Sequence, residues 1–288
     1  MSPADYEPVI ERALAEDLGT RGDVTSEAVI PERLTARARL MARAPGVVAG
    51  LEIAAAVFAR VDADLRFEPS VSEGAEVRAG DVIASVSGRA RSILTAERTA
   101  LNVLGRMSGV ATATRRLVEA VDGTAARISD TRKTMPGLRA LDKYAVLMGG
   151  GLNHRMGLYD AVLIKDNHLA AVGDIAAAVG AARAAVGPEM MIEVEVDDLD
   201  QLAAVLATDA DRVLLDNMDL DTMRRAVELV AGSMITEASG GVTEGTVRAI
   251  ALTGVDVIST GWITHSAPQL DIALDFVPQA RPSVPSPP

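Results

Sequence analysis

Short amphipathic segments make up the first part of the chain. Residues 5–16 place apolar side chains at helical spacing, whereas residues 34–41 alternate apolar and polar positions as a strand does. Residues 46–61 are predicted to form a second helix, and residues 65–86 alternate again around glycine-containing turns. The pattern therefore predicts an N-terminal α/β domain with short antiparallel strands, which we assign to residues 1–110.

A long helix is predicted next, over residues 97–121. Its apolar side chains recur every three or four positions, the spacing that gives a helix one continuous apolar face. The residues that set this spacing are Leu101, Leu104, Met107, Val110, Leu117 and Val121. A helix of this length is expected to join two domains.

The rest of the chain, residues 111–276, repeats a unit in which a short apolar run precedes a helical segment. The runs cover residues 125–129, 161–164, 191–196, 212–215, 234–236 and 255–259. This repetition predicts parallel strands with right-handed crossovers. Because no glycine-rich dinucleotide-binding turn opens the series, we favour a barrel over an open doubly wound sheet.

Polar residues with useful chemistry gather where these runs end. They are Asp130-Thr131-Arg132-Lys133, Lys165-Asp166-Asn167-His168, Glu195, Asp216-Asn217, Glu237-Ala238-Ser239-Gly240-Gly241 and Thr260-Gly261. Parallel α/β folds bind their ligands at the carboxyl ends of the strands. The sequence therefore predicts one active site that is assembled from several strand ends.

The net charge of −12 is distributed unevenly along the chain. So acidic a protein is not expected to bind nucleic acid or anionic membranes, because either partner requires a basic surface. Residues 127–165 nevertheless carry seven basic against three acidic residues, a net +4 that leaves −16 for the rest. The chain's three lysines, Lys133, Lys143 and Lys165, all lie in this segment. We expect the segment to bind a compact, highly charged anion.

Two arginines and a lysine of this segment are candidates to hold the anion. Arg132 and Lys165 follow the first and second runs, and the glycines at 149–151 allow the chain to bend so that His154 and Arg155 reach the same edge. Two planar guanidinium groups and a lysine would bind a dicarboxylate or a phosphate. The competing interpretation is a charged loop that is simply solvated.

Two carboxylates and two small-residue turns follow at the next strand ends. Glu195 and Asp216 are candidates to ligate Mg²⁺ or to accept hydrogen bonds from sugar hydroxyls, unless they form a structural ion pair. The turns Ser239-Gly240-Gly241 and Thr260-Gly261 would bind phosphate through backbone N–H groups, or would only permit tight turns. Since the sequence has no P-loop motif, phosphate has to be held by turns of this kind.

Targeting and membrane signals are missing from the sequence. Residues 1–5 show neither the basic nor the apolar region of a signal peptide. The most apolar stretch of the chain is too short for a membrane span and contains Glu52 and Arg60. The absence of cysteine suits a reducing compartment. We expect a cytoplasmic protein with no membrane span. Residues 277–288 include five prolines and are predicted to be a disordered tail.

Taken together, the motifs resemble those of one family, the quinolinate phosphoribosyltransferases, or carboxylating nicotinate-nucleotide pyrophosphorylases, of NAD biosynthesis. They are Glu16-Asp17-Leu18-Gly19, residues 94–102, 130–134, 153–160, 164–168 and 193–196, Leu215-Asp216-Asn217, residues 237–241 and Thr264-His265-Ser266. The resemblance implies an incomplete α/β barrel of about seven parallel strands with an N-terminal α/β sandwich domain. It also implies a homodimer, or a higher oligomer, with active sites at the subunit interface.

The resemblance further implies a role for each candidate residue. Quinolinate would be bound by Arg132, His154, Arg155 and Lys165 together with the partner subunit's Arg98. Phosphoribosyl pyrophosphate would be bound by Lys133, Glu195, Asp216, Ser239, Gly240, Gly261 and His265. Lys133, Glu195 and Asp216 would be catalytic, and the two carboxylates would hold Mg²⁺ partly through the substrate. The products would be nicotinate mononucleotide, CO₂ and pyrophosphate.

Two alternative functions stay open at this point. A related branch associated with molybdenum transport shares the fold and several motifs, but the complete set of quinolinate residues favours the transferase. A non-catalytic barrel that senses an anionic metabolite is the other alternative. Glu195 and Asp216 argue against it, because a pure anion sensor has little use for two carboxylates facing its ligand. Met135, Trp262 and residues 242–245 depart from the family's usual pattern.

Overall fold

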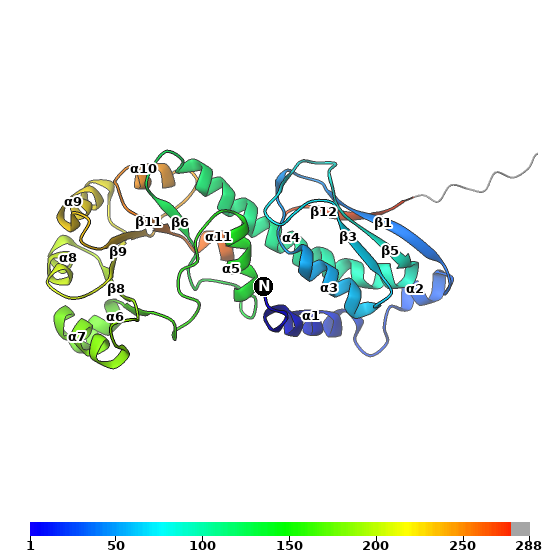
Figure 1. Ribbon diagram of the computed structural model, residues 1–288, viewed down its shortest axis with the longest axis horizontal. Helices are drawn as coiled ribbons and strands as arrows, with labels where there is room; N and C mark the ends of the chain where they lie inside the picture. Colours follow the sequence, from blue (N-terminus) through cyan, green and yellow to red (C-terminus); the bar gives the residue numbers. More distant parts are fainter. Residues whose placement is uncertain (278–288) are drawn as a thin grey trace, which may run out of the picture. The chain divides into compact units, whose positions relative to one another are not determined.

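The computed structural model describes residues 1–277, which fall into two compact units (Figure 1). Unit 1 comprises Met1–Gly109 and the segment from Pro268 onward, and unit 2 comprises Val110–Ala267. Helix α4 (Ala90–Ala120) contains the boundary between the two units. The predicted long helix therefore exists and begins earlier than expected, at Ala90. Beyond Val277, the predicted proline-rich tail lies outside the described residues.

Unit 1 is built on a four-stranded antiparallel sheet with the strand order β12-β1-β5-β3. The strands are β1 (Thr35–Ala42), β3 (Arg66–Pro69), β5 (Val82–Arg89) and β12 (Ile272–Phe276), and β2 (Gly46–Val47) pairs separately with β4 (Glu76–Val77). Alternate side chains of β1, such as Ala38 and Leu40, are fully buried, and so are Ile83 and Val86 of β5. That alternation gives the sheet one apolar face, against which helices can pack.

Helices of unit 1 begin at residues that satisfy their first N–H groups. The helices are α1 (Pro3–Leu18), α2 (Val24–Val29) and α3 (Leu51–Val61). Asp23 caps α2 by accepting a hydrogen bond from the Ser26 N–H at 2.9 Å. Thr25 and Ser26 both lie inside this helix, so Asp23 is the residue at its N-cap.

Two segments of unit 1 differ from the sequence-based assignment. Residues 272–276, which we had placed with the barrel, pair antiparallel with β1 as strand β12. Residues 46–61 are a short strand followed by α3 instead of one helix. Gly50, with φ 102°, turns the chain between them, a conformation that favours glycine. The Glu73 carboxylate then accepts hydrogen bonds from the N–H groups of Gly50 and Leu51, where α3 begins.

Unit 2 contains a six-stranded parallel sheet with the order β6-β11-β10-β9-β8-β7. The strands are β6 (Arg127–Ser129), β7 (Val162–Ile164), β8 (Ile192–Val196), β9 (Arg212–Asp216), β10 (Ile235–Ser239) and β11 (Val257–Ser259). All six predicted runs are thus strands of one sheet, as expected. Leu152 forms a single parallel bridge with Ser129 beside β6, so a further strand is reduced to one residue. The fold is the expected incomplete α/β barrel, with six strands instead of about seven.

Helices follow the strands of unit 2 in chain order. They are α5 (Arg139–Met148), α6 (Asp166–Val172), α7 (Ile175–Val186), α8 (Leu199–Leu206), α9 (Leu220–Val230), α10 (Val247–Ala251) and α11 (Trp262–His265). Asp174, Asp198 and Asp219 cap α7, α8 and α9. Strand side chains such as Val194 and Val213 are fully buried. This packing leaves the carboxyl ends of the strands to carry polar residues.

No single helix among the described residues is long and apolar enough to cross a bilayer. Helices α6 and α7 meet the length and composition criteria together, as a pair bent by 99°.

Candidate active site

A cavity of about 660 Å³ lies at the carboxyl ends of the unit 2 strands, a size typical of small-molecule sites. Its lining is Thr131, Arg132, Lys133, His154, Arg155, Leu163, Lys165, Glu195, Leu214, Asp216, Asn217, Glu237, Ser239, Gly240, Gly241 and Ser259. Nine of the site residues predicted from the sequence therefore line one cavity. They are Arg132, Lys133, His154, Arg155, Lys165, Glu195, Asp216, Ser239 and Gly240.

Three predicted site residues are not part of this lining. Arg98 belongs to unit 1, where it is exposed on α4. Gly261 and His265 lie behind Lys133 instead: a Cβ atom on Gly261 would come within 2.9 Å of the Lys133 side chain and 3.1 Å of His265 Cδ2. Thr264 Oγ1 also donates a hydrogen bond to the Lys133 carbonyl at 2.8 Å. In this structure Gly261 and His265 thus pack beside Lys133.

Two arginines concentrate positive charge at one side of the cavity. The Nε atoms of Arg132 and Arg155 are buried and have no hydrogen-bond partner. Arg155 uses Nη1 to donate to the Ala161 carbonyl at 3.0 Å. Burial, followed by the charge of Arg132, lowers the pKa of the Arg155 guanidinium. An anion bound between these groups would relieve both the repulsion and the loss of hydration.

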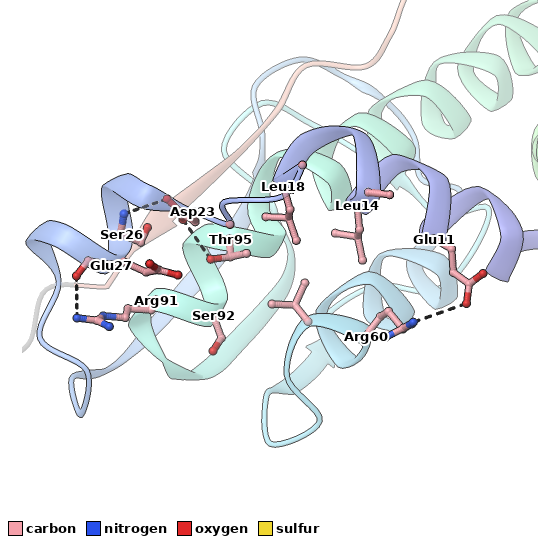
Figure 2. Close-up of a pocket in the computed structure, with 14 residues that line it drawn as sticks. Glu11, Leu14, Leu18, Asp23, Ser26, Glu27, Arg60, Arg91, Ser92 and Thr95 are labelled. Atoms are coloured by element: carbon pink, nitrogen blue, oxygen red, sulfur yellow. Dashed lines mark hydrogen bonds and ion pairs between the residues drawn. The ribbon is translucent and has the colours of Figure 1, made fainter.

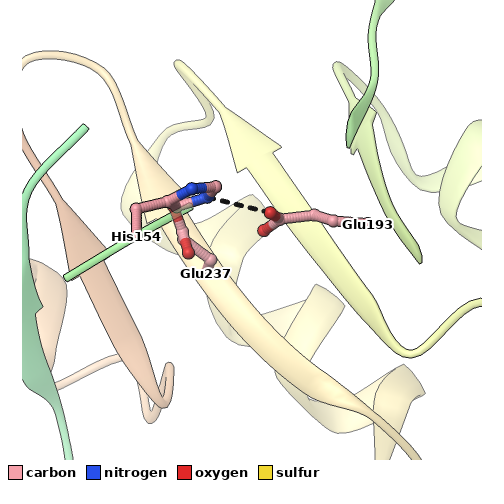
Figure 3. Close-up of side chains that lie close together, drawn as sticks. All are labelled: His154, Glu193 and Glu237. Atoms are coloured by element: carbon pink, nitrogen blue, oxygen red, sulfur yellow. Dashed lines mark hydrogen bonds and ion pairs between the residues drawn. The ribbon is translucent and has the colours of Figure 1, made fainter. Parts of the chain in front are cut away.

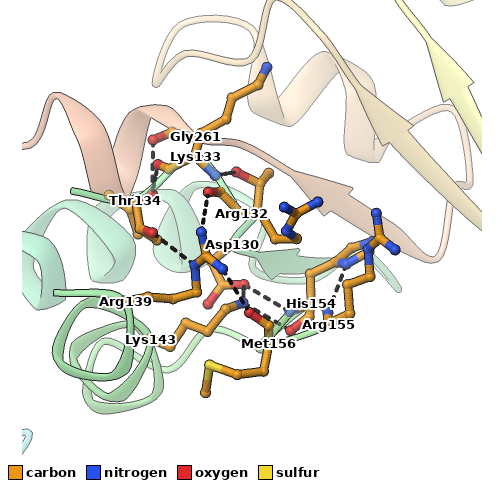
Figure 4. A network of polar contacts seen from close by, with 12 residues as sticks. Asp130, Arg132, Lys133, Thr134, Arg139, Lys143, His154, Arg155, Met156 and Gly261 are labelled. Carbon is orange, nitrogen blue, oxygen red and sulfur yellow. Dashed lines mark hydrogen bonds and ion pairs between the residues drawn. The ribbon is translucent and has the colours of Figure 1, made fainter. Parts of the chain in front are cut away.

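A buried ion pair holds the loop that carries His154 and Arg155. The Lys143 ammonium contacts the Asp130 carboxylate, and neither side chain is more than 1% exposed. Lys143 also donates to the His154 carbonyl at 2.9 Å, while Asp130 accepts from the His154 N–H at 2.8 Å (Figure 4). Burial raises the pKa of Asp130 to about 6 despite the opposing charge of Lys143. This pair fixes the backbone of the loop.

Arg139 of helix α5 reinforces the same region. Its guanidinium donates to Thr134 Oγ1 and to the carbonyls of Met156 and Arg132 at 3.1 to 3.3 Å (Figure 4). Lys143 and Arg139 were counted in the basic segment expected to bind an anion. In the structure both serve the protein's own loops, because their donors are used internally.

The carboxylate side of the cavity meets the cationic side directly. Lys165, after β7, contacts Glu195 of β8 as an ion pair. Asp216, at the end of β9, accepts from the Asn217 side chain at 2.7 Å. A candidate anion ligand and a candidate metal ligand are therefore neighbours. A bound metal or sugar hydroxyl would compete with Lys165 for Glu195.

The turn after β10 requires glycine. Gly240 has φ 97°, and a Cβ atom there would lie 2.1 Å from Asn217 Oδ1. Asn217 itself has φ 51° and donates its N–H to the Ser239 carbonyl at 2.9 Å. Two strand ends are thus locked together, with little room above the Gly240 backbone. Such a turn lets a ligand approach the main chain closely.

Buried ionisable residues gather at the cavity, and of these only His154 has a role predicted from the sequence. Glu193, Glu237 and His154 form a group of potential metal ligands whose donor atoms lie within 4.8 Å of one another, as found among the described residues (Figure 3). Arg212 adds a positive charge, at 2.9 Å from Glu237. A signal was present: Glu193 and Glu195 are two residues apart on one strand, and alternate residues of a strand point to the same face. Thr131, Asn217 and Ser259 also line the cavity without a role predicted from the sequence.

Unit 1 has a cavity too, of about 830 Å³, beside α1, α2 and the start of α4. Its polar groups pair with one another (Figure 2). Thr95 donates to Asp23 at 3.1 Å, Arg91 donates to the carbonyls of Ile30 and Glu27, and Arg60 pairs with Glu11. With its charges matched internally, this cavity is a weaker candidate for an active site.

Both units match models of known domain families. Residues 23–108 match the N-terminal domain of quinolinate phosphoribosyl transferase, and residues 110–275 match its C-terminal domain. A nicotinate-nucleotide pyrophosphorylase [carboxylating] of Mycobacterium leprae is 46% identical over 272 residues, which cover 93% of this chain and 95% of that protein. A probable nicotinate-nucleotide pyrophosphorylase [carboxylating] of Bacillus subtilis is 42% identical, covering 96% of this chain and 94% of that protein.

Solved structures agree with the sequence matches. The nicotinate-nucleotide pyrophosphorylase of Francisella tularensis superposes with a TM-score of 0.91 at 38% identity, covering 96% of this chain and 98% of that chain. NadC from Streptococcus pyogenes gives a TM-score of 0.92 at 37% identity, covering 96% and 99%. The two matched domains, the relatives and the shared fold lead to one conclusion: this chain belongs to the quinolinate phosphoribosyltransferase family.

Proposed function

We propose that this chain transfers the 5-phosphoribosyl group from phosphoribosyl pyrophosphate to quinolinate with decarboxylation. The products are nicotinate mononucleotide, CO₂ and pyrophosphate, as a step of NAD biosynthesis. One observation carries the proposal beyond family membership: Arg132, Arg155 and Lys165 share a single cavity with Glu195 and Asp216. Cations suited to a dicarboxylate thus lie beside carboxylates suited to a sugar and a metal. A non-catalytic anion sensor would have no use for the second group.

The cationic side of the cavity is the proposed quinolinate site. Quinolinate carries two adjacent carboxylates, and Arg132 and Arg155 offer planar guanidinium groups that bind carboxylates through paired hydrogen bonds. Lys165 supplies a compact third charge. His154 lines the same side, and we keep it in the proposed site together with the partner subunit's Arg98. The unpaired, buried Nε atoms of Arg132 and Arg155 support this assignment.

The opposite side is the proposed site of phosphoribosyl pyrophosphate. Ser239 and Gly240 offer backbone and hydroxyl donors to phosphate, and Lys133, backed by Gly261 and His265, reaches the same cavity. Glu195 and Asp216 are suited to ribose hydroxyls. Both also present the oxygen atoms that Mg²⁺ prefers, whereas the buried group around His154 includes a nitrogen donor. We therefore assign Mg²⁺ to Glu195 and Asp216.

The proposed reaction follows from binding quinolinate and phosphoribosyl pyrophosphate at opposite sides of the same cavity. The bond between ribose C1 and the pyrophosphate oxygen breaks as the quinolinate nitrogen attacks C1, and pyrophosphate leaves with the bonding electrons. Lys133 stabilises the departing charge, and Glu195 and Asp216 stabilise the cationic sugar centre. Mg²⁺ would neutralise further charge on pyrophosphate. The quaternised ring nitrogen then accepts the electrons of the adjacent C–CO₂ bond, so CO₂ leaves and C2 takes a proton from solvent.

A direct assay tests the proposal. Purified chain is incubated with quinolinate, phosphoribosyl pyrophosphate and Mg²⁺, and nicotinate mononucleotide and CO₂ are measured. We expect equal amounts of both products, loss of activity with EDTA, and recovery with Mg²⁺. A chain that binds quinolinate but forms no product would be a sensor, and full activity without a divalent ion would remove Mg²⁺ from the proposal.

The oligomeric state is part of the same proposal: a cytoplasmic homodimer whose sites are shared between subunits. Arg98 is exposed on α4 and lies outside the lining of the unit 2 cavity, which supports its use by a partner subunit. Arg98→Ala and Lys165→Ala homodimers should each be nearly inactive. After complete random exchange, about half the dimers are mixed and carry one intact site of two. About a quarter of wild-type activity should then return. No recovery after verified exchange would contradict a shared site.

A further inference from the structure

A layer of buried ionisable groups forms part of the cavity wall, which His154 and Glu237 line. The Glu193 and Glu237 side chains are 0% exposed and the His154 side chain is 6% exposed. Glu193 comes from β8 and Glu237 from β10, and both face the His154 ring (Figure 3). Charged groups are buried this deeply only where specific partners hold them. The layer therefore needs an explanation.

Hydrogen bonds to the ring define the protonation state of His154. The Arg155 N–H donates to Nδ1 at 2.8 Å, so Nδ1 accepts and carries no proton. Nε2 lies 2.9 Å from Glu193 Oε2, a carboxylate oxygen that accepts. These two contacts together require a neutral ring with its proton on Nε2. Both ring nitrogens are thus used inside the protein.

Glu237 and Arg212 complete the layer. Arg212 Nη1 donates to Glu237 Oε2 at 2.9 Å, and Glu237 Oε1 lies 3.6 Å from His154 Nε2. The Nε2 proton points into the space that a metal would share with Glu193. A guanidinium next to the same carboxylates repels a cation as well. The arrangement is that of a positioning network.

This network of hydrogen bonds holds Arg155, which lines the cavity. The His154 main chain is fixed from one side by Asp130 and Lys143. From the other side, the Arg155 N–H is held by the His154 ring, and that ring is held by Glu193. A shift of the ring would therefore move the start of the Arg155 side chain. The Arg155 guanidinium carries the charge that the cavity presents to an anion.

We propose that Glu193 is a positioning residue for quinolinate recognition, which keeps the His154 proton on Nε2 so that Nδ1 anchors Arg155. His154 then contributes to the site by orienting Arg155, and its ring N–H is directed toward Glu193. This inference rests on the proposed function for its ligand. The hydrogen bonds on which it depends belong to the protein alone.

Steady-state kinetics give the first test. Glu193→Ala removes the acceptor, and we expect the KM for quinolinate to rise at least tenfold while the KM for phosphoribosyl pyrophosphate changes less than threefold. Glu193→Gln keeps an oxygen that accepts from Nε2, so its quinolinate KM should stay within about threefold of wild type. Equal KM increases in both variants, or equal effects on both substrates, would overturn the proposal.

A matched control separates positioning from loss of stability. Asp256 accepts hydrogen bonds from the N–H and hydroxyl of Thr236, at the opposite end of β10 from the cavity. Asp256→Asn should lower the melting temperature and leave the quinolinate KM unchanged. If this variant raised the quinolinate KM as much as Glu193→Ala does, the role of Glu193 would be structural only.

A spectroscopic readout tests the geometry independently of catalysis. The chain has three histidines, so ¹⁵N-histidine labelling gives few ring signals, and those of His154 are identified by their loss in His154→Asn. At pH 7.5 the wild type should show the neutral tautomer protonated on Nε2, and Glu193→Ala should lose that single tautomer. A protonated ring, or a proton on Nδ1, would overturn the proposal. An inactive wild type with the expected tautomer would instead contradict the proposed function.

Discussion

The cavities of the two units differ in how their charges are balanced. Beside α1 and α2, every charge described above has an internal partner: Arg91 donates to backbone carbonyls, and Asp23 accepts from Ser26 and Thr95. At the strand ends of unit 2, the buried Nε atoms of Arg132 and Arg155 have no partner. The first cavity is larger, yet only the second presents unmet hydrogen-bonding capacity.

This difference shows why cavity size alone is a poor guide to function. Buried polar groups without partners cost free energy, and a fold tolerates them where a ligand will satisfy them. In unit 1 the polar groups stabilise helix ends. In unit 2, Arg132 and Arg155 line one cavity, close enough for the charge of Arg132 to lower the pKa of Arg155. Substitutions in the two cavities should therefore act on different quantities, stability in one and substrate binding in the other.

The largest effect is expected from Lys165→Ala. Removing this charge should lower kcat/KM for quinolinate about 30- to 150-fold, because a charge-assisted contact with the substrate contributes roughly 2 to 3 kcal/mol. Lys165→Arg should still lose about tenfold, since a planar guanidinium does not replace a compact ammonium group in contact with Glu195. Initial rates at varied quinolinate measure both.

The control for this prediction comes from the other cavity. Arg91 donates to the carbonyls of Ile30 and Glu27 at 2.9 Å or less. Arg91→Ala should lower the melting temperature and leave kcat/KM near the wild-type value. If the Arg91→Ala variant were fully folded and still lost as much activity as Lys165→Ala, the distinction between the two cavities would fail.

Much of the fold could be predicted because its signals are local. Each parallel strand of unit 2 is a short apolar run, and the polar residue after it marks the strand end, as Glu195 and Asp216 do. Strand β12 could not be assigned to its sheet from the sequence, because its partner β1 lies more than 200 residues away in the chain. An apolar segment reveals that it is a strand but not which sheet it joins. The expected seventh strand is reduced to one bridge, between Leu152 and Ser129 of β6.

Only those residues of the candidate site that come directly after a strand could be predicted from the sequence. Lys143 was counted with the basic residues expected to face an anion, but it is buried against Asp130, 13 positions earlier. Glu193 was part of a recognised motif and received no role. Its function depends on where the His154 ring lies, and that contact joins residues 39 positions apart. Composition and spacing do not define such long-range pairs.

The next effect in size concerns the turn after β10. Gly240→Ala would place a Cβ atom 2.1 Å from Asn217 Oδ1 at a φ of 97°, so the turn has to move. We expect the KM for phosphoribosyl pyrophosphate to rise about tenfold or more, a loss of about 1.4 kcal/mol in binding. Gly241→Ala is the matched variant: nothing lies within 4 Å of its Cβ position, although φ is 62°. Its effect should be smaller, and an equal effect would assign the loss to backbone strain alone.

A smaller, pH-dependent effect is expected from Glu237→Gln. Burial, then the charge of Glu193, raises the pKa of Glu237 to about 7, although His154, Ser259 and Arg212 oppose the shift. A carboxyl whose pKa is higher in the folded state stabilises the fold below its unfolded pKa, near 4.5, and loses that contribution as pH rises through 7. The wild type should therefore lose stability relative to Glu237→Gln between pH 5 and pH 8, by on the order of 1 to 3 kcal/mol. Chemical denaturation at several pH values measures this difference, and a constant difference would contradict the shift.

The smallest effect should come from Asp23→Ala in the unit 1 cavity. Asp23 caps α2, and loss of a helix cap costs about 1 kcal/mol, a few degrees in melting temperature. Burial would raise the pKa of Asp23, but hydrogen bonds from Ser26 and Thr95 lower it, so the stability it contributes is present above pH 4 and lost as pH falls further. The variant should thus differ from wild type at pH 7, and the difference should shrink as the pH falls below 4, with kcat and both KM values at pH 7 unchanged. A changed quinolinate KM would mean that the unit 1 cavity takes part in catalysis, and the contrast between the two cavities would then fail.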